Sequence, residues 1–145
     1  MIEIKTAAEI ESMREASRVV AEVLAQLRSR VKPGVTTAEL DKFAEQRVRE
    51  LGAVPAFLGY RGYPATLCVS INEEIVHGIP SPKRAVREGD IVSLDMGAVI
   101  GGFYGDAAIT VAAGKVSDQA LRLMEVTKVS LDKALSAVKA GVRLG

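Results

Sequence analysis

Residues 91–111 have the sequence IVSLDMGAVIGGFYGDAAITV. The segments 91–96 and 104–111 are rich in β-forming residues, and Gly101-Gly102 between them suits a tight two-residue turn. This stretch therefore predicts two antiparallel strands joined in a hairpin.

Each predicted strand has one apolar face and one face with a carboxylate, because side chains alternate along a strand. Asp95 lies on the less apolar face of the first strand, and Asp106 lies on that of the second. The apolar face of the first strand holds Val92, Leu94, Met96 and Ala98. One side of the hairpin is thus expected to enter a core and the other to carry chemistry.

The turn fixes how the two aspartates are placed. A two-residue turn pairs Asp95 with Ala108 and Gly97 with Asp106, so the aspartates become diagonal neighbours on one face. Their backbones are then roughly 7–8 Å apart. A three-residue loop would change the parity and separate the faces.

Two carboxylates on one face repel each other unless a proton or a cation lies between them. A divalent metal resolves the repulsion, since one carboxylate can bind a single ion while the other bridges two. The alternative is a solvated strand face on which Asp95 and Asp106 are surface charges. The spacing of the two aspartates does not by itself exclude that alternative.

Upstream of the hairpin, the sequence predicts two helices that each begin with a capping box. Thr6 with Glu9 precedes apolar residues at helical spacing and predicts a helix from about residue 7 to about residue 30. Thr36 with Glu39 predicts a second helix, which Gly52 ends.

The remaining segments complete an α+β pattern. Residues 55–64 mix glycine, proline and aromatic residues and predict a structured loop, and residues 66–71 predict a further strand. Ser117 predicts the start of a final helix with an apolar stripe of Leu121, Met124, Leu131, Leu135 and Val138. The order α-α-β-β-β-α with adjacent antiparallel strands predicts an α+β fold, with a sheet covered by helices.

Composition limits the class of protein. The chain has 145 residues, 48% of them apolar and 26% charged, as expected for one globular domain. A net charge of +1 gives no electrostatic footprint for nucleic acid or a membrane surface. A single cysteine, the absence of a secretory signal pattern and the absence of a long apolar run predict a cytoplasmic protein.

One short repeat bears on the size of the protein. Residues 31–35 are VKPGV and residues 138–142 are VKAGV, an offset of 139 − 32 = 107 residues. Chance can produce such an echo. If it is a true repeat, a second copy begins near residue 138 and the intact protein has about 250 residues.

Three motifs, taken together, resemble a known family. They are NEEIVHGIP at residues 72–80, LDMG at residues 94–97 and GDAA at residues 105–108. In this order and spacing they are similar to the short bacterial type I methionine aminopeptidases, and the resemblance extends over the whole chain. It implies a pita-bread fold, in which two related halves enclose two divalent metal ions. Residues 1–145 would be the amino-terminal portion of that single catalytic domain, without its carboxy-terminal half.

The resemblance implies roles for the metal ligands. Asp95 matches the ligand that binds one ion, and Asp106 matches the bridging ligand. The other three ligands, one histidine and two glutamates, belong to the second half. The metals could be Co, Mn, Fe or Zn.

The resemblance also implies a substrate site. His77 matches a histidine near the scissile amide, where an imidazole can donate to a developing charge or a departing amine. Tyr60, Tyr63 and Cys68 match positions that line the methionine pocket, and Phe57 falls at another such position. The alternative for these residues is ordinary packing, and the bulk of Phe57 leaves the pocket width open.

The expected function of the intact protein is removal of the initiator methionine from nascent chains with a small second residue. This chain alone is expected to be inactive, because three ligands are missing. The expected partner is a peptide with an N-terminal methionine, the ribosome is a further candidate, and the full-length protein is expected to be a monomer. The alternatives are a proline-specific pita-bread peptidase and a non-catalytic pita-bread module that binds a protein.

Overall fold

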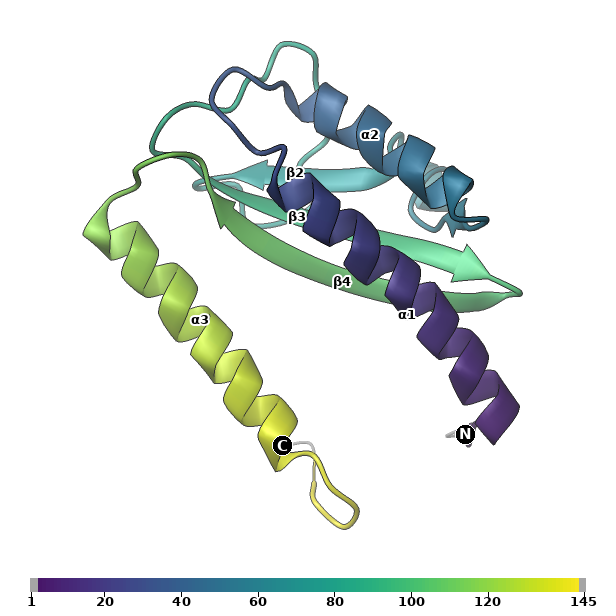
Figure 1. Cartoon of the computed structure of the whole chain (residues 1–145). Helices are drawn as coiled ribbons and strands as arrows, with labels where there is room; N and C mark the ends of the chain where they lie inside the picture. Colours follow the sequence, from purple (N-terminus) through teal and green to yellow (C-terminus); the bar gives the residue numbers. More distant parts are fainter. Residues whose placement is uncertain (1–2, 144–145) are drawn as a thin grey trace.

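The structure, a computed structural model, describes residues 3–143 and has the α+β architecture that the sequence predicts. Two helices, α1 (Ala7–Arg28) and α2 (Thr37–Glu50), cover one face of a four-stranded antiparallel sheet (Figure 1). Both begin at the predicted capping boxes: the Glu9 carboxylate accepts the Thr6 N–H at 2.7 Å, and the Glu39 carboxylate accepts the Thr36 N–H at 2.8 Å. Local capping thus sets both helix starts.

The central strand of the sheet is β3 (Ile91–Ile100). It pairs on one side with β2 (Leu67–Ile71) and the short β1 (Val54–Pro55), and on the other with β4 (Phe103–Ala112). Strand β3 is longer than the predicted 91–96, because its ladder with β4 continues to the turn.

The turn between β3 and β4 has the predicted two residues. Gly101 and Gly102 have φ values of 55° and 84°, which favour glycine at both positions of a tight hairpin turn. Ile100 pairs with Phe103, as predicted. The predicted register of the hairpin is therefore confirmed.

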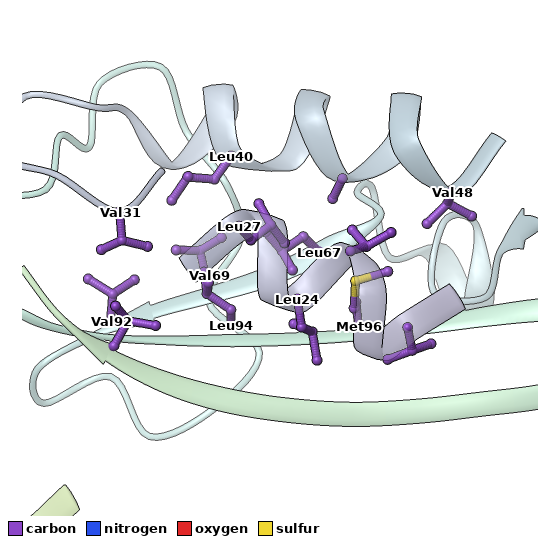
Figure 2. Close-up of a cluster of buried hydrophobic side chains, with 14 of the residues drawn as sticks. Leu24, Leu27, Val31, Leu40, Val48, Leu67, Val69, Val92, Leu94 and Met96 are labelled. Atoms are coloured by element: carbon purple, nitrogen blue, oxygen red, sulfur yellow. The ribbon is translucent and has the colours of Figure 1, made fainter. Parts of the chain in front are cut away.

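The core lies between the helices and the sheet. Leu24 and Leu27 of α1 and Leu40 and Val48 of α2 pack with Leu67, Val69, Val92, Leu94 and Met96 of the strands (Figure 2). The apolar face predicted for β3 is fully buried there. This packing fixes which side of the hairpin faces away from the helices.

The predicted loop between α2 and β2 is structured. It contains β1 and a short 3₁₀ turn, Tyr60–Gly62, neither of which the sequence predicted as a separate element. The Gly59 N–H donates to the Tyr63 carbonyl at 2.8 Å and closes the turn. The loop therefore presents its aromatic residues from an ordered backbone.

The last helix, α3 (Asp118–Ala137), begins at Ser117, whose hydroxyl accepts the Ala120 N–H at 3.2 Å. It leads away from the sheet in Figure 1, and none of its residues is buried. Most of the predicted apolar stripe is exposed, with Leu135 at 62%. Over residues 3–143, no helix is both long and apolar enough to cross a membrane.

The sequence echo has a structural counterpart. The Val35 N–H donates to Lys32 O at 3.2 Å, and the Val142 N–H donates to Lys139 O at 3.3 Å. The glycine before each valine has a left-handed backbone, with φ values of 94° and 86°. The two turns thus share a hydrogen bond and a backbone conformation; a true repeat, with a second half after α3, stays a prediction.

Candidate active site

The carboxylates of Asp95 and Asp106 lie on the face of the hairpin that the helices do not cover. Asp95 pairs with Ala108 and Gly97 pairs with Asp106, so the aspartates are diagonal neighbours as predicted. On β3 the intervening residues Leu94 and Met96 face the buried core instead. The alternation of β3 and β4 therefore places two carboxylates side by side.

The electrostatics of Asp95 show that these carboxylates interact. Burial raises the pKa of Asp95 above its usual value, and the negative charge of Asp106 raises it further. The nearby His77 acts in the opposite direction and lowers that pKa. Asp95 is half-buried, whereas Asp106 and His77 are exposed. The three side chains thus form one electrostatic cluster in which negative charge is in excess.

This cluster fits part of a metal site. Two carboxylates that repel each other provide the hard oxygen donors that divalent cations prefer. A bound cation would offset the repulsion and lower the raised pKa of Asp95. Among residues 3–143, however, no three His, Cys, Asp or Glu side chains form a group that could hold a metal ion. Asp95 and Asp106 can therefore contribute to a metal site but do not complete it.

His77 lies in the loop after β2 on a backbone of unusual conformation. Its φ is 60°, in the left-handed region that few non-glycine residues adopt. Such conformations persist only where the surrounding structure enforces them, and they are frequent at functional sites. The next residue, Gly78, is held against β2, since its carbonyl accepts the Val69 N–H at 2.9 Å.

All seven residues predicted for the site line one cavity of about 700 Å³. They are Phe57, Tyr60, Tyr63, Cys68, His77, Asp95 and Asp106. They come from the loop before β2, from three strands and from the loop after β2. The structure thus brings together residues that lie up to 49 positions apart (106 − 57) in the sequence.

Tyr63 and Cys68 form an uncharged wall of this cavity. The Tyr63 hydroxyl lies 3.2 Å from Leu67 O and 3.1 Å from Gly78 O. Burial raises the pKa of the Tyr63 phenol, and it also raises the pKa of the Cys68 thiol beside Asp95. Both groups therefore remain neutral at physiological pH, which suits contact with an apolar ligand.

Phe57 lies against Gly97 of β3, which is on the same face of the strand as Asp95. A Cβ on Gly97 would be 2.9 Å from Cε1 of Phe57 and 2.9 Å from the Cβ of Ala56. The missing side chain of Gly97 therefore makes room for the phenyl ring over the sheet. Phe57 lines the cavity at this point, and its effect on the width of the pocket stays open.

Four cavity residues were not predicted: Arg61, Gly62, Pro64 and Ile79. Arg61 has a φ of 49°, and its guanidinium carbon lies 5.5 Å from the ring centroid of Tyr60. Ile79 belongs to the NEEIVHGIP motif, so the motif itself could have indicated it. No sequence pattern distinguishes Arg61 from other surface arginines.

The two glutamates upstream of His77, Glu73 and Glu74, lie in the turn after β2. The Glu74 carboxylate accepts the Ile71 N–H at 2.7 Å and lies 4.0 Å from the Arg84 guanidinium. Glu73 is exposed. These contacts assign Glu74 to closure of the turn after β2.

A second hollow, of about 520 Å³, lies over α1 and α2 and is lined by Gln26, Arg30, Glu39, Lys42, Phe43, Gln46 and Arg47. Arg47 is paired there with Glu22 and Glu50, and Arg30 lies over the ring of Phe43 at 3.7 Å. Arg47 is thus paired within the surface, and the hollow holds none of the predicted site residues, so the cavity around Asp95 is the better candidate for catalysis.

Comparison with known proteins agrees with this site. The sequence pattern of metallopeptidase family M24 matches residues 11–145. The methionine aminopeptidase of Clostridium acetobutylicum is 50% identical over 144 residues, which cover 99% of this chain and 58% of that protein. Methionine aminopeptidase 1 of Bacillus subtilis is 47% identical, with the same coverage of each chain. The chain therefore spans somewhat more than half the length of these relatives.

Solved structures give the same result. The methionine aminopeptidase of Thermotoga maritima superposes with a TM-score of 0.98 at 44% identity, over 100% of this chain and 58% of that one. An X-Pro aminopeptidase of the same organism has a TM-score of 0.78 at 24% identity and supports the fold alone. The pita-bread assignment, for the part of the fold that this chain represents, is thereby confirmed.

Proposed function

Because the chain belongs to metallopeptidase family M24, we propose that it forms the amino-terminal part of an aminopeptidase that removes the initiator methionine from nascent proteins with a small second residue. The observation that carries the proposal is the shared cavity. Two carboxylates, a histidine and a neutral aromatic wall all line it. A peptide N-terminus that enters this space would meet all three kinds of group.

The family's description as metallopeptidases implies metal use, and we propose two divalent ions. Asp95 would bind one ion and Asp106 would bridge both, with a histidine and two glutamates supplied by the second half. The oxygen-rich set admits cobalt, manganese, iron or zinc. When bound, the ions would supply Lewis-acid polarisation of the scissile carbonyl and of a water molecule.

The residues of this chain would bind and orient the substrate. Tyr60, Tyr63, Cys68 and Phe57 would surround the methionine side chain, since neutral aromatic and sulfur groups suit a thioether. His77, exposed in the same cavity, would donate a hydrogen bond to the scissile carbonyl or to the leaving nitrogen. Without three of the five metal ligands, this chain alone would show no peptidase activity.

The setting of the enzyme follows from its substrate. Nascent chains carry the initiator methionine, so we propose that the protein is cytoplasmic and that the ribosome is a candidate partner. The full-length protein is proposed to be a monomer. The two alternatives receive no support from a specific observation: the loop at residues 60–63 keeps both tyrosines, and both aspartates are present.

The test uses the complete enzyme, meaning this chain joined to the carboxy-terminal segment that its curated relatives have. Asp106→Ala should abolish dinuclear metal binding, measured by calorimetric titration, and should abolish cleavage of Met-Ala-Ser. Glu73→Ala, which removes an exposed carboxylate beside the motif, is the matched control and should retain both. Wild-type activity of the Asp106 variant would refute the metal assignment, and preferential cleavage of Ala-Pro peptides by the wild type would refute the substrate.

A further inference from the structure

The position of His77 depends on the peptide unit that follows it. His77 is exposed and has a left-handed backbone, so its own contacts do little to hold it. A peptide unit is planar, so the direction of the Gly78 N–H fixes the direction of the His77 carbonyl. A group that fixes the direction of the Gly78 N–H therefore restrains the ψ angle of His77.

The Gly78 N–H donates to the hydroxyl oxygen of Ser70 at 3.1 Å. Ser70 lies in β2 and is 3% exposed, one of three buried polar residues among those that the structure describes. A buried hydroxyl group destabilises the fold unless it forms a hydrogen bond. The hydroxyl of Ser70 forms one with the N–H of the His77–Gly78 peptide unit.

The other side of Gly78 is fixed as well. Its carbonyl accepts the Val69 N–H at 2.9 Å and lies 3.1 Å from the Tyr63 hydroxyl. A Cβ at this position would lie only 2.2 Å from Val69 O, so no other residue can approach β2 so closely. These contacts fix Gly78 itself, whereas the Ser70 bond acts on the peptide unit that His77 shares.

We propose that Ser70 is a positioning residue for His77, acting through the Gly78 N–H. The proposal rests on the proposed function in one respect, namely that His77 assists the reaction. Without the Ser70 hydroxyl, the His77–Gly78 peptide unit can rotate, which changes the ψ angle of His77 and lets the imidazole leave the cavity. Ser70 does not itself line the cavity.

The chain offers a matched control in Ser93. Ser93 pairs with Ser70 across β2 and β3, but its hydroxyl is bonded to Thr110 at 2.9 Å on the next strand. Ser70→Ala and Ser93→Ala therefore each remove one hydroxyl from neighbouring strands. Only the first removes a bond to the His77 segment.

The experiment compares these variants in the complete enzyme. In Ser70→Ala we expect amide exchange at Gly78, followed by NMR, to accelerate and kcat to fall on the order of 10-fold, with KM within about twofold and metal content unchanged. Ser70→Cys, which keeps a weaker acceptor of similar size, should give a smaller loss of kcat. Ser93→Ala should change neither Gly78 exchange nor kcat, and equal losses in both serine variants would overturn the proposal.

A double-mutant cycle separates positioning from a general loss of stability. If Ser70 acts through His77, adding Ser70→Ala to His77→Ala should lower kcat no further than His77→Ala alone. An additive loss would overturn the proposal. If His77→Ala retains full activity, the proposed role of His77 fails, whereas unchanged Gly78 exchange in Ser70→Ala would show that the structural link itself is wrong.

Discussion

The two faces of the β3–β4 hairpin are built from alternate residues of the same strands, yet one is apolar and buried and the other carries charged groups. On the face covered by α1 and α2, Leu94 and Met96 are fully buried. On the opposite face, Asp95 and Asp106 lie side by side, and burial and mutual repulsion raise the pKa of Asp95. The first face lowers the free energy of the fold, and the second holds charges that the fold does not neutralise.

This difference indicates that the open face, rather than the covered one, carries the candidate functional groups. A face that contributes little to stability can hold groups selected for chemistry, provided that the other face supplies enough burial. Substitutions on the covered face should therefore change stability strongly, and those on the open face should change ligand binding instead.

The largest expected effect is on the covered face. Leu94→Ala should lower the free energy of unfolding of the complete enzyme by roughly 2–5 kcal/mol, because it leaves a cavity beneath α1. Thr110→Ala on the open face, which removes only a hydroxyl bonded to Ser93, should cost about 1 kcal/mol or less. Urea unfolding measures both, and equal costs would contradict the division between the faces.

Two glycines allow a finer comparison. A Cβ on Gly105 would lie 2.6 Å from backbone atoms of Ala16 and Ser17 in α1, which cannot move aside without shifting the helix. Gly105→Ala should therefore cost roughly 1–3 kcal/mol in thermal or urea unfolding. A Cβ on Gly97 would meet the ring of Phe57, which can turn aside, and the Cβ of Ala56, which moves only with its backbone, so Gly97→Ala should cost less than Gly105→Ala but narrow the cavity.

The prediction fails if Gly97→Ala destabilises the protein more than Gly105→Ala. It also fails if Gly97→Ala leaves the KM for methionyl peptides unchanged, because the ring of Phe57 would then not bound the cavity.

These glycines also show what the sequence could not predict. Alternation, capping boxes and the Gly-Gly turn depend on neighbouring residues, so they predicted the helices, the strands and the register of Asp95 with Asp106. The close approach of α1 to Gly105 depends on three-dimensional packing, which has no local pattern. The same holds for the bond from Gly78 to Ser70, and for Arg61, which reaches the cavity through a left-handed backbone.

The helices give a similar lesson. Helix α3 was predicted from Ser117 and its spacing, because helix starts are local. What covers its apolar stripe is a tertiary property, and among the described residues nothing buries it. The resemblance to methionine aminopeptidases, by contrast, selected seven residues that the structure finds around one cavity, although their roles stay predictions.

An effect of similar size to that of Gly105→Ala is expected at Asp41, a carboxylate on the covered side. It accepts the N–H groups of Thr66 and Leu67, each at 2.9 Å, and so joins α2 to the start of β2. Asp41→Ala should cost about 1–3 kcal/mol, because it leaves both donors without an acceptor. Asp41→Asn keeps an acceptor and should change stability by less than about 1 kcal/mol.

The difference in stability between the wild type and Asp41→Asn should depend on pH in a defined direction. Burial raises the pKa of Asp41 above its usual value, so the folded state holds a proton more tightly than the unfolded state. The wild type should therefore lose stability relative to Asp41→Asn as pH rises from the ordinary aspartate pKa through the raised folded value. Urea unfolding across that range measures the difference, and the opposite slope would contradict the assignment.

The smallest expected effect is at Asp95, where the sign depends on metal. In the complete enzyme with chelator, Asp95→Asn removes a charge that burial and Asp106 both disfavour, so unfolding should become harder by a few tenths of a kcal/mol after screening by solvent. With saturating divalent metal the order should reverse, because the wild type alone gains the binding free energy. Thermal unfolding with and without metal measures this, with Glu73→Asn as the control for loss of an exposed carboxylate. If Asp95→Asn were less stable in both conditions, Asp95 would contribute to the fold like Asp41, and the open face would not be specialised for a cation.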